Sequence, residues 1–327
     1  MIVVPHSEAS VSYVGDVDFR VVVDPQFGAT YADQLAVARA AEDLGFSAFF
    51  RSDHYLAPGV AGLPGPTDSW VTLGALARET TRIRLGTMVT SITFRYPGPL
   101  AITVAQVDEM STGRIELGIG AGWLEDEHRA YGIPFPTLGE RFDRLAEQLG
   151  ILTGLWSTPV GETFDYRGSY YTLADSPALP KPLQRPHPPI IVGGMGAKRT
   201  PALAAQFASE FNLPGLAQPD AAAAQLQRVA EAVAAAGRPA ESMVYSAVFA
   251  LCIGRDDKEV ARRADPVRRL IPGVTDISPL VGTPGQVVDR CGALSELGIQ
   301  RVYAWLLDMG DLEQLELFAT SVMPHLR

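Results

Sequence analysis

Short apolar runs alternate with helical patterns along most of the chain. The runs are rich in Val, Ile, Leu and Phe, and most of them end in small or polar residues. Between the runs, apolar residues recur at the spacing of an amphipathic helix. This alternation predicts parallel strands joined by helices. The predicted strands are 19–24, 47–51, 83–88, 114–119, 190–192, 210–213, 244–253 and 301–307, and the main predicted helices are 30–44, 69–79, 99–110, 139–155, 220–236, 257–264, 284–297 and 312–323.

Eight strands of this kind predict an α/β fold, a single (β/α)8 TIM barrel over residues 1–327, because right-handed crossovers repeated eight times close into a barrel. The alternation of strands and helices is interrupted at about 156–189. Within it, residues 163–173 have the pattern of a β-hairpin around a Gly-Ser turn, and a proline-rich loop follows. We expect this insertion, between the fourth and fifth units, to lie over the barrel mouth and gate substrate entry.

Composition narrows the function. The chain is 47% hydrophobic and 20% charged, with no low-complexity tract, which favours one large core. A net charge of −10 without a basic cluster argues against nucleic acid or an anionic membrane surface as partner, and favours a small-molecule substrate. Two cysteines make no disulfide framework, and the sequence has neither a signal peptide nor a membrane span, so we expect a cytoplasmic protein.

The segment Ser52-Asp53-His54 follows the second predicted strand. Barrels carry their reactive groups at the carboxyl ends of the strands, so Asp53 and His54 are candidate catalytic residues. The alternative is a structural Asp–His hydrogen bond at a strand end. A second cluster, 125–128, contains three acids and a histidine, but acidic residues just after a strand are more typical of a helix N-terminus, and we expect no metal site.

A glycine-rich loop, Gly193-Gly194-Met195-Gly196, follows the fifth predicted strand and precedes a helix. It lacks the order of residues of a P-loop. Its backbone N–H groups and the helix dipole could still hold a phosphate, with Lys198 or Arg199 nearby. The alternative is a simple tight turn.

With these residues in view, the chain resembles the bacterial luciferase-like superfamily, and within it the actinobacterial oxidoreductases that use the deazaflavin coenzyme F420. The similarity covers nearly the whole chain. The segments that carry it are Ser52-Asp53-His54-Tyr55, 82–97, 106–123, 139–142 and 188–200.

The resemblance implies that the cofactor ring lies at the carboxyl ends of the strands. It implies a β-bulge with a non-proline cis peptide at Met88-Val89 beneath the ring, with Asp53 and Ser91 close to it. It further implies that the glycine-rich loop holds the cofactor phosphate. The cofactor-binding residues expected from it are Asp53, Met88, Val89, Ser91, Gly193, Gly194, Met195 and Gly196. Related sugar-phosphate dehydrogenases have a Glu and a Trp where this chain has Trp123 and Pro58, which argues against glucose 6-phosphate as substrate.

The leading hypothesis is therefore an F420-dependent oxidoreductase that moves a hydride between the deazaflavin and a small organic substrate. In it, His54 handles the proton and Asp53 orients His54. An FMN-dependent monooxygenase of the same superfamily and a catalytically silent flavin-binding barrel are the alternatives. Members of the superfamily are commonly dimers, so we expect a homodimer.

Overall fold

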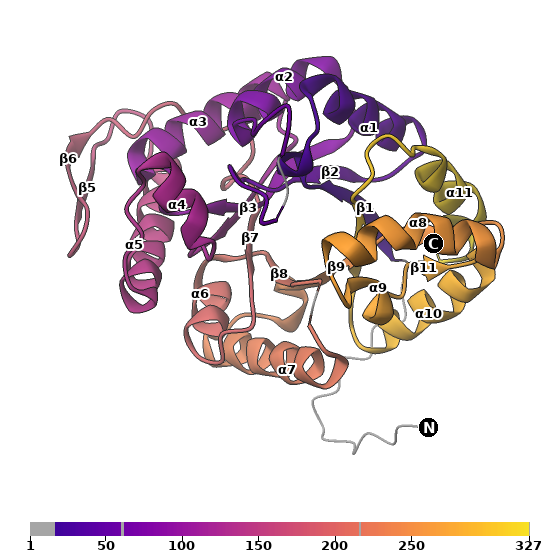
Figure 1. Ribbon diagram of the computed structural model, residues 1–327. Coiled ribbons are helices and arrows are strands. Elements are labelled where there is room, and N and C mark those ends of the chain that lie inside the picture. Colours follow the sequence, from indigo (N-terminus) through magenta and orange to yellow (C-terminus); the bar gives the residue numbers. More distant parts are fainter. Residues whose placement is uncertain (1–16, 60–61, 216, 327) are drawn as a thin grey trace.

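The computed structural model describes residues 17–59, 62–215 and 217–326, and its centre is a closed barrel of eight parallel strands (Figure 1). Their order around the barrel is β1-β12-β9-β8-β7-β4-β3-β2, which is the chain order of a TIM barrel. The barrel strands are β1 (Asp18–Val23), β2 (Ala48–Arg51), β3 (Arg84–Ser91), β4 (Ile115–Gly120), β7 (Ile190–Gly193), β8 (Glu210–Leu213), β9 (Val244–Ala250) and β12 (Arg301–Leu306). The predicted fold is confirmed.

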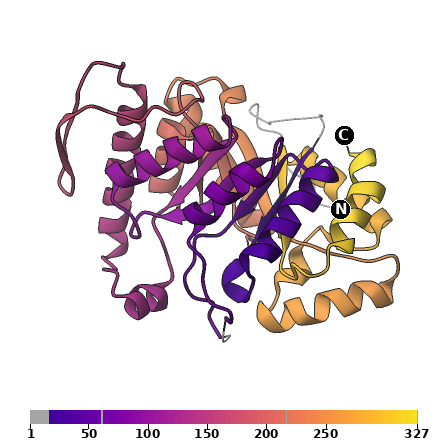
Figure 2. The same cartoon turned by 90° about the horizontal axis from the view of Figure 1, so that it is seen from above.

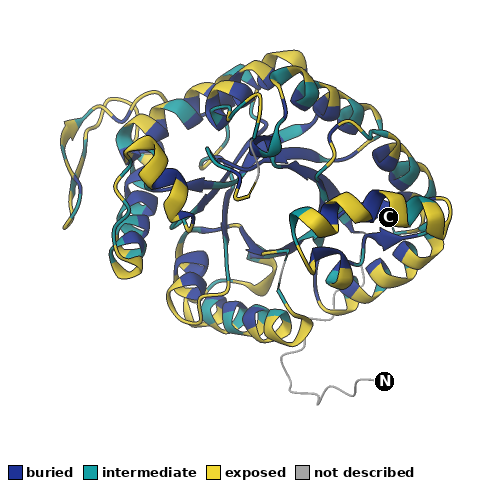
Figure 3. Ribbon diagram, viewed as in Figure 1, coloured by how far each residue is buried: buried dark blue, intermediate teal, exposed yellow. Residues whose placement is uncertain are grey.

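Helices form a ring around the strands and turn their apolar faces inward (Figures 1 and 3). They are α1 (Tyr31–Asp43), α2 (Ser69–Glu79), α3 (Pro97–Met110), α4 (Glu125–Tyr131), α5 (Leu138–Ser157), α6 (Arg199–Phe207), α7 (Pro219–Ala235), α8 (Asp257–Leu270), α9 (Val274–Ile277), α10 (Pro284–Glu296) and α11 (Glu313–Ser321). Thr30 is the N-cap of α1, and Thr30 and Asp33 form a reciprocal capping box there. None of the described helices has the length and apolar character that crossing a bilayer requires.

The seventh barrel strand is shorter than predicted. The apolar run 244–253 divides into β9 and a separate short strand, β10 (Cys252–Ile253), which pairs with β11 (Val281–Gly282). The backbone leaves the barrel at Leu251, and Ser278 Oγ donates a hydrogen bond to the carbonyl of Ala250 at 2.7 Å. Apolar character alone cannot reveal this change of pairing partner, because both strands are buried.

The insertion does contain a hairpin, β5 (Phe164–Arg167) and β6 (Thr172–Ser176), but the expectation that it covers the mouth is wrong. It stands outside the ring of helices beyond α5, and Figure 2 shows it on the same outer flank. Glu147 of α5 accepts hydrogen bonds from the backbone N–H groups of Ser169, Tyr170 and Tyr171. The physical reason is topological: the insertion follows a helix, so it begins at the amino-terminal end of the strands, opposite the mouth.

Charged side chains fill the amino-terminal end of the barrel interior. At the amino-terminal end, Glu116 forms ion pairs with Arg20, at 2.6 Å, and with Arg84. On the other side, Glu210 accepts from Arg301 at 2.6 Å and from the Tyr303 hydroxyl at 2.8 Å. This buried network fills the barrel at the amino-terminal ends of the strands, here called the lower end. We therefore expect a ligand to enter from the carboxyl ends of the strands.

Candidate active site at the barrel mouth

Asp53 is buried just beyond the end of β2, and its carboxylate faces Arg95 rather than His54. Arg95 Nη1 lies 2.5 Å from Asp53 Oδ2, and Nη2 lies 2.5 Å from Asp68 Oδ2. The two carboxylates therefore share one guanidinium. The prediction that Asp53 orients His54 is wrong, because the Asp53 carboxylate is already engaged by this cation.

Glu127, in the first turn of α4, is the residue that orients His54. Its carboxylate oxygens lie 3.0 and 3.1 Å from His54 Nδ1, and one of them accepts the backbone N–H of Tyr55 at 2.9 Å. Glu127 is only 1% exposed. Since a carboxylate only accepts, Nδ1 carries the proton, and Nε2 is the nitrogen left for a ligand. Within the described residues, Nε2 has no hydrogen-bond partner.

The surroundings of His54 favour its protonated form. Burial alone would lower the pKa of His54, but the hydrogen bond and charge of Glu127, with smaller contributions from Asp24 and Asp53, raise the pKa above its ordinary value. The indole of Trp123 stands edge-on to the imidazole with ring centroids 5.5 Å apart. Trp123 itself is 67% exposed.

The wall formed by β3 and β4 carries the bulge that the resemblance implied. The peptide bond between Met88 and Val89 is cis, and the pairing of β3 with β4 shifts between Thr87 and Thr90. A Cβ at Gly120 would lie 3.0 Å from the Val89 side chain, closer than most side-chain contacts allow. The absence of a side chain there makes room for the bulge.

Ser91 lies at the end of β3 and begins a buried polar chain. Its hydroxyl oxygen is 2.6 Å from Thr93 Oγ1, which is 2.6 Å from His128 Nε2. His128 Nδ1 lies 2.7 Å from the carbonyl of Leu124 and must donate to it. In the neutral imidazole Nε2 then accepts from Thr93, Thr93 accepts from Ser91, and Ser91 Oγ keeps its lone pairs for another donor.

The glycine-rich loop lies at the carboxyl end of β7, before α6. Gly194 has a φ of +124°, which disfavours any side chain. A Cβ at Gly196 would lie 2.6 Å from Thr200 Oγ1, so the loop also approaches α6 too closely for one. The backbone N–H groups of residues 195–197 donate to no other group among the described residues. Bare amides at a helix N-terminus are what a phosphate binds.

Two cations flank this loop in different ways. Arg199 pairs with Asp143 and donates to the carbonyl of Gly139 at 2.9 Å, so α5 already occupies it. Lys198 forms no ion pair within the described part of the chain. Of the two basic residues that sequence reasoning singled out, only Lys198 is available to an anion.

The sequence interpretation missed Glu127 and Arg95 as members of the mouth. The acidic cluster 125–128 was noticed, and α4 does begin there, but its pattern does not reveal which acid turns inward.

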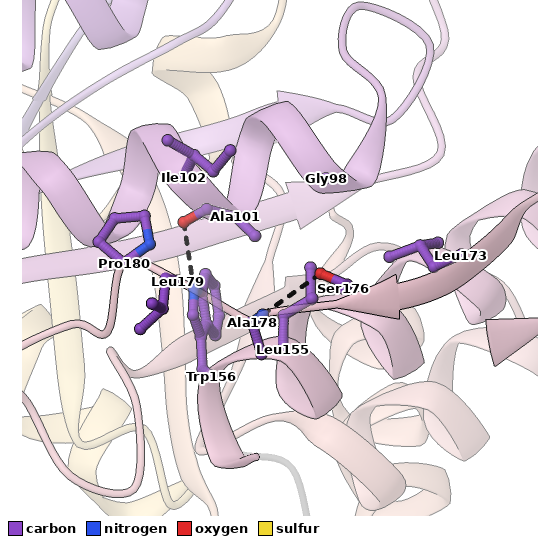
Figure 4. Close-up of a pocket in the computed structure, with 10 residues that line it drawn as sticks. All are labelled: Gly98, Ala101, Ile102, Leu155, Trp156, Leu173, Ser176, Ala178, Leu179 and Pro180. Carbon is purple, nitrogen blue, oxygen red and sulfur yellow. Dashed lines mark hydrogen bonds between the residues drawn. The ribbon is translucent and has the colours of Figure 1, made fainter. Parts of the chain in front are cut away.

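A small pocket elsewhere, between α3, α5, β6 and the segment after β6, is lined mainly by apolar residues, among them Trp156 and Leu179 (Figure 4). It contains no titratable side chain and lies on the side of the hairpin, so it is not the candidate site.

His54, the β-bulge and the glycine-rich loop lie at the same end of a parallel (β/α)8 barrel, which is the end where barrel enzymes have their active sites. Comparison of sequences identifies the family. The luciferase-like monooxygenase family matches residues 17–279. The chain belongs to this family.

Several curated relatives are similar over part of the chain. An uncharacterised protein of Mycobacterium tuberculosis is 36% identical over 179 residues, which is 50% of this chain and 61% of that protein. The F420-dependent glucose-6-phosphate dehydrogenase of Microbacterium testaceum is 37% identical over 49% of this chain and 46% of its own length. The FMNH2-dependent dimethylsulfone monooxygenase of Pseudomonas putida is 28% identical over 71% and 72%. The chain thus spans less than two thirds of the length of the first two.

Among solved structures, an F420-dependent secondary alcohol dehydrogenase in complex with an F420-acetone adduct has a TM-score of 0.80. The match is 20% identical and covers 96% of this chain and 100% of that one. At this identity the likeness supports the barrel fold and nothing finer.

Proposed function

We propose that the chain is an F420-dependent oxidoreductase that transfers a hydride between carbon five of the deazaflavin and a small organic substrate. The observation that carries the proposal is His54, whose Nδ1 is bound by the buried Glu127 while Nε2 has no hydrogen-bond partner among the described residues. The F420-dependent relative at 37% identity supports the cofactor assignment. An oxidoreductase of the luciferase-like family is the broader statement on which this proposal builds.

The residues at the mouth fit a phosphorylated tricyclic cofactor. The N–H groups of residues 195–197 have no acceptor among the described residues, and within 193–196 only Met195 carries a side chain that could fill the space. Val89 would support the ring face, and Ser91 Oγ would offer an acceptor to an N–H or O–H group. When bound, the deazaflavin would supply a carrier that takes up or gives two electrons together as one hydride.

Hydride transfer to a carbonyl carbon requires a proton at the carbonyl oxygen, and oxidation of an alcohol requires its removal. We assign this proton to His54 Nε2. Glu127 would stabilise the imidazolium and fix the tautomer that leaves Nε2 facing the substrate. Asp53 and Arg95 would hold the backbone beyond β2 in place without touching the proton.

An FMN-dependent monooxygenase is the second candidate, supported by the relative that matches 71% of the chain. Titration of the purified protein with oxidised F420 and with FMN, followed by fluorescence, separates the two. We expect F420 to bind at least about tenfold more tightly, a difference of about 1.4 kcal/mol. Equal or tighter binding of FMN would refute the F420 assignment, and oxygen consumption with reduced FMN would then test the monooxygenase.

A further inference from the structure

We propose that Gln225 of α7 is a positioning residue that holds the glycine-rich loop in its anion-binding form. This inference rests on the proposed function, since it assumes that the loop receives the cofactor phosphate. Gln225 is completely buried, although it belongs to a residue type that is mostly exposed in proteins. Its Nε2 donates to two loop carbonyls, those of Gly194 and Gly196, each at 3.1 Å.

Those two hydrogen bonds determine whether the loop presents N–H groups or carbonyl oxygens to a ligand at the mouth. A phosphate is repelled by carbonyl oxygens and attracted by N–H groups. By binding the carbonyls of Gly194 and Gly196 from the side of α7, Gln225 keeps them turned away from the mouth. The amides of residues 195–197 remain without an acceptor in the part of the chain that the structure describes. Loss of the Gln225 side chain would remove this donor from both carbonyls and free them to rotate toward the ligand.

Arg228 binds the other end of the Gln225 side-chain amide. Its Nη1 donates to Gln225 Oε1 at 2.7 Å, and this bond polarises the amide so that Nε2 becomes a better donor. It also fixes which end of the amide faces the loop. No carboxylate pairs with Arg228 in the described part of the chain, so the region beside the loop keeps its positive charge. Gln225 and Arg228 together would therefore favour a negatively charged phosphate over a neutral group.

The test compares ligands with and without the phosphate. FMN and riboflavin differ only in the phosphate, whereas F420 and its phosphate-free deazaflavin core differ in the phosphate and in the tail attached to it. For each pair, the dissociation constant of the phosphate-free ligand divided by that of the phosphorylated ligand gives the contribution of the phosphate as a ratio. In Gln225→Met we expect this ratio to fall about tenfold or more, while the phosphate-free ligand binds as before. A loss of this size is expected when the loop amides no longer form their hydrogen bonds to the charged phosphate. Gln225→Glu, which can accept from Arg228 but cannot donate to the carbonyls, should behave likewise.

Two further variants sharpen the comparison. Gln227→Met is the matched control, because Gln227 is exposed on the same helix and its side chain hydrogen-bonds to Glu231 and not to the loop. The ratio of this variant should equal that of the wild type. Arg228→Gln removes the charge and should flatten the salt dependence of FMN binding. An unchanged ratio in Gln225→Met, or an equal loss for both ligands in folded protein, would overturn the inference. Failure of the wild type to bind either ring system would instead overturn the proposed function, and this inference with it.

Discussion

Replacing Glu127 by Gln tests the centre of the proposed site without requiring a known substrate. The change keeps the size of the side chain and an oxygen that can accept the N–H of Tyr55, now 2.9 Å from the carboxylate. It removes the negative charge beside His54 Nδ1. We expect the pKa of His54 to fall, because burial, which lowers it, is no longer opposed by the Glu127 charge.

The same change should alter stability in a pH-dependent way. The pKa of folded His54 is raised, so its contribution to stability is fully present below the unfolded pKa and is lost as pH rises through the folded pKa. A hydrogen bond between charged groups contributes about 1.5–3 kcal/mol when buried. His54 is 23% exposed, which reduces this to about 1–2 kcal/mol. The variant should lose that amount at acidic pH and much less at alkaline pH.

Two measurements check the reasoning. NMR titration of protein labelled at its five histidines gives the pKa of His54 directly, with His54→Gln to assign the signal. Denaturant unfolding at about pH 5.5 and about pH 9.5 gives the free energies of unfolding whose difference the linkage predicts. An unshifted His54 pKa, or the same destabilisation at both pH values, would show that Glu127 acts only by packing.

Three further changes have defined outcomes. His54→Ala should lower turnover about 10²–10⁴-fold with cofactor affinity retained, measured by steady-state kinetics and titration; full activity would make the histidine structural. Gly194→Val should weaken FMN or F420 binding, because φ is +124° there, while circular dichroism stays unchanged. Glu116→Gln should lower the free energy of unfolding by about 3 kcal/mol in urea, because the buried Arg20 loses one of its two carboxylate partners and the half-buried Arg84 loses its ion pair. Burial opposes ionisation of Glu116, but Arg20 and Arg84 lower its pKa to about 2, so its contribution is lost only as pH falls toward that value.

Much of the barrel could be predicted from the sequence because each strand is a short buried run and each helix has one apolar face. The positions of β1 and α1 needed only that pattern and the capping residues at Thr30 and Asp33. The hairpin was recognisable as well, but its place was not. An insertion after α5 starts at the lower end of the barrel, so connection order, rather than composition, excludes it from the mouth.

The site was less predictable because its decisive contacts join distant segments. Asp53 and His54 are neighbours in sequence, which suggested a pair, but successive residues beyond a strand point in different directions. His54 therefore meets Glu127, 73 residues away, and Asp53 meets Arg95, 42 residues away. Sequence proximity predicted the place of these side chains correctly and their partners wrongly.

The two ends of the barrel differ in how far their polar groups are satisfied, and this difference separates stability from function. At the lower end Glu116 and Glu210 each meet a cation, and Tyr303 completes the network. A closed network of this kind has no donor or acceptor left for a ligand. At the mouth His54 Nε2 and the amides of the glycine-rich loop have no protein partner among the described residues, although their neighbours are held firmly. Unsatisfied polar groups on a rigid frame are costly unless water or a ligand completes their hydrogen bonds, and this supports the proposal that binding and chemistry take place at the mouth.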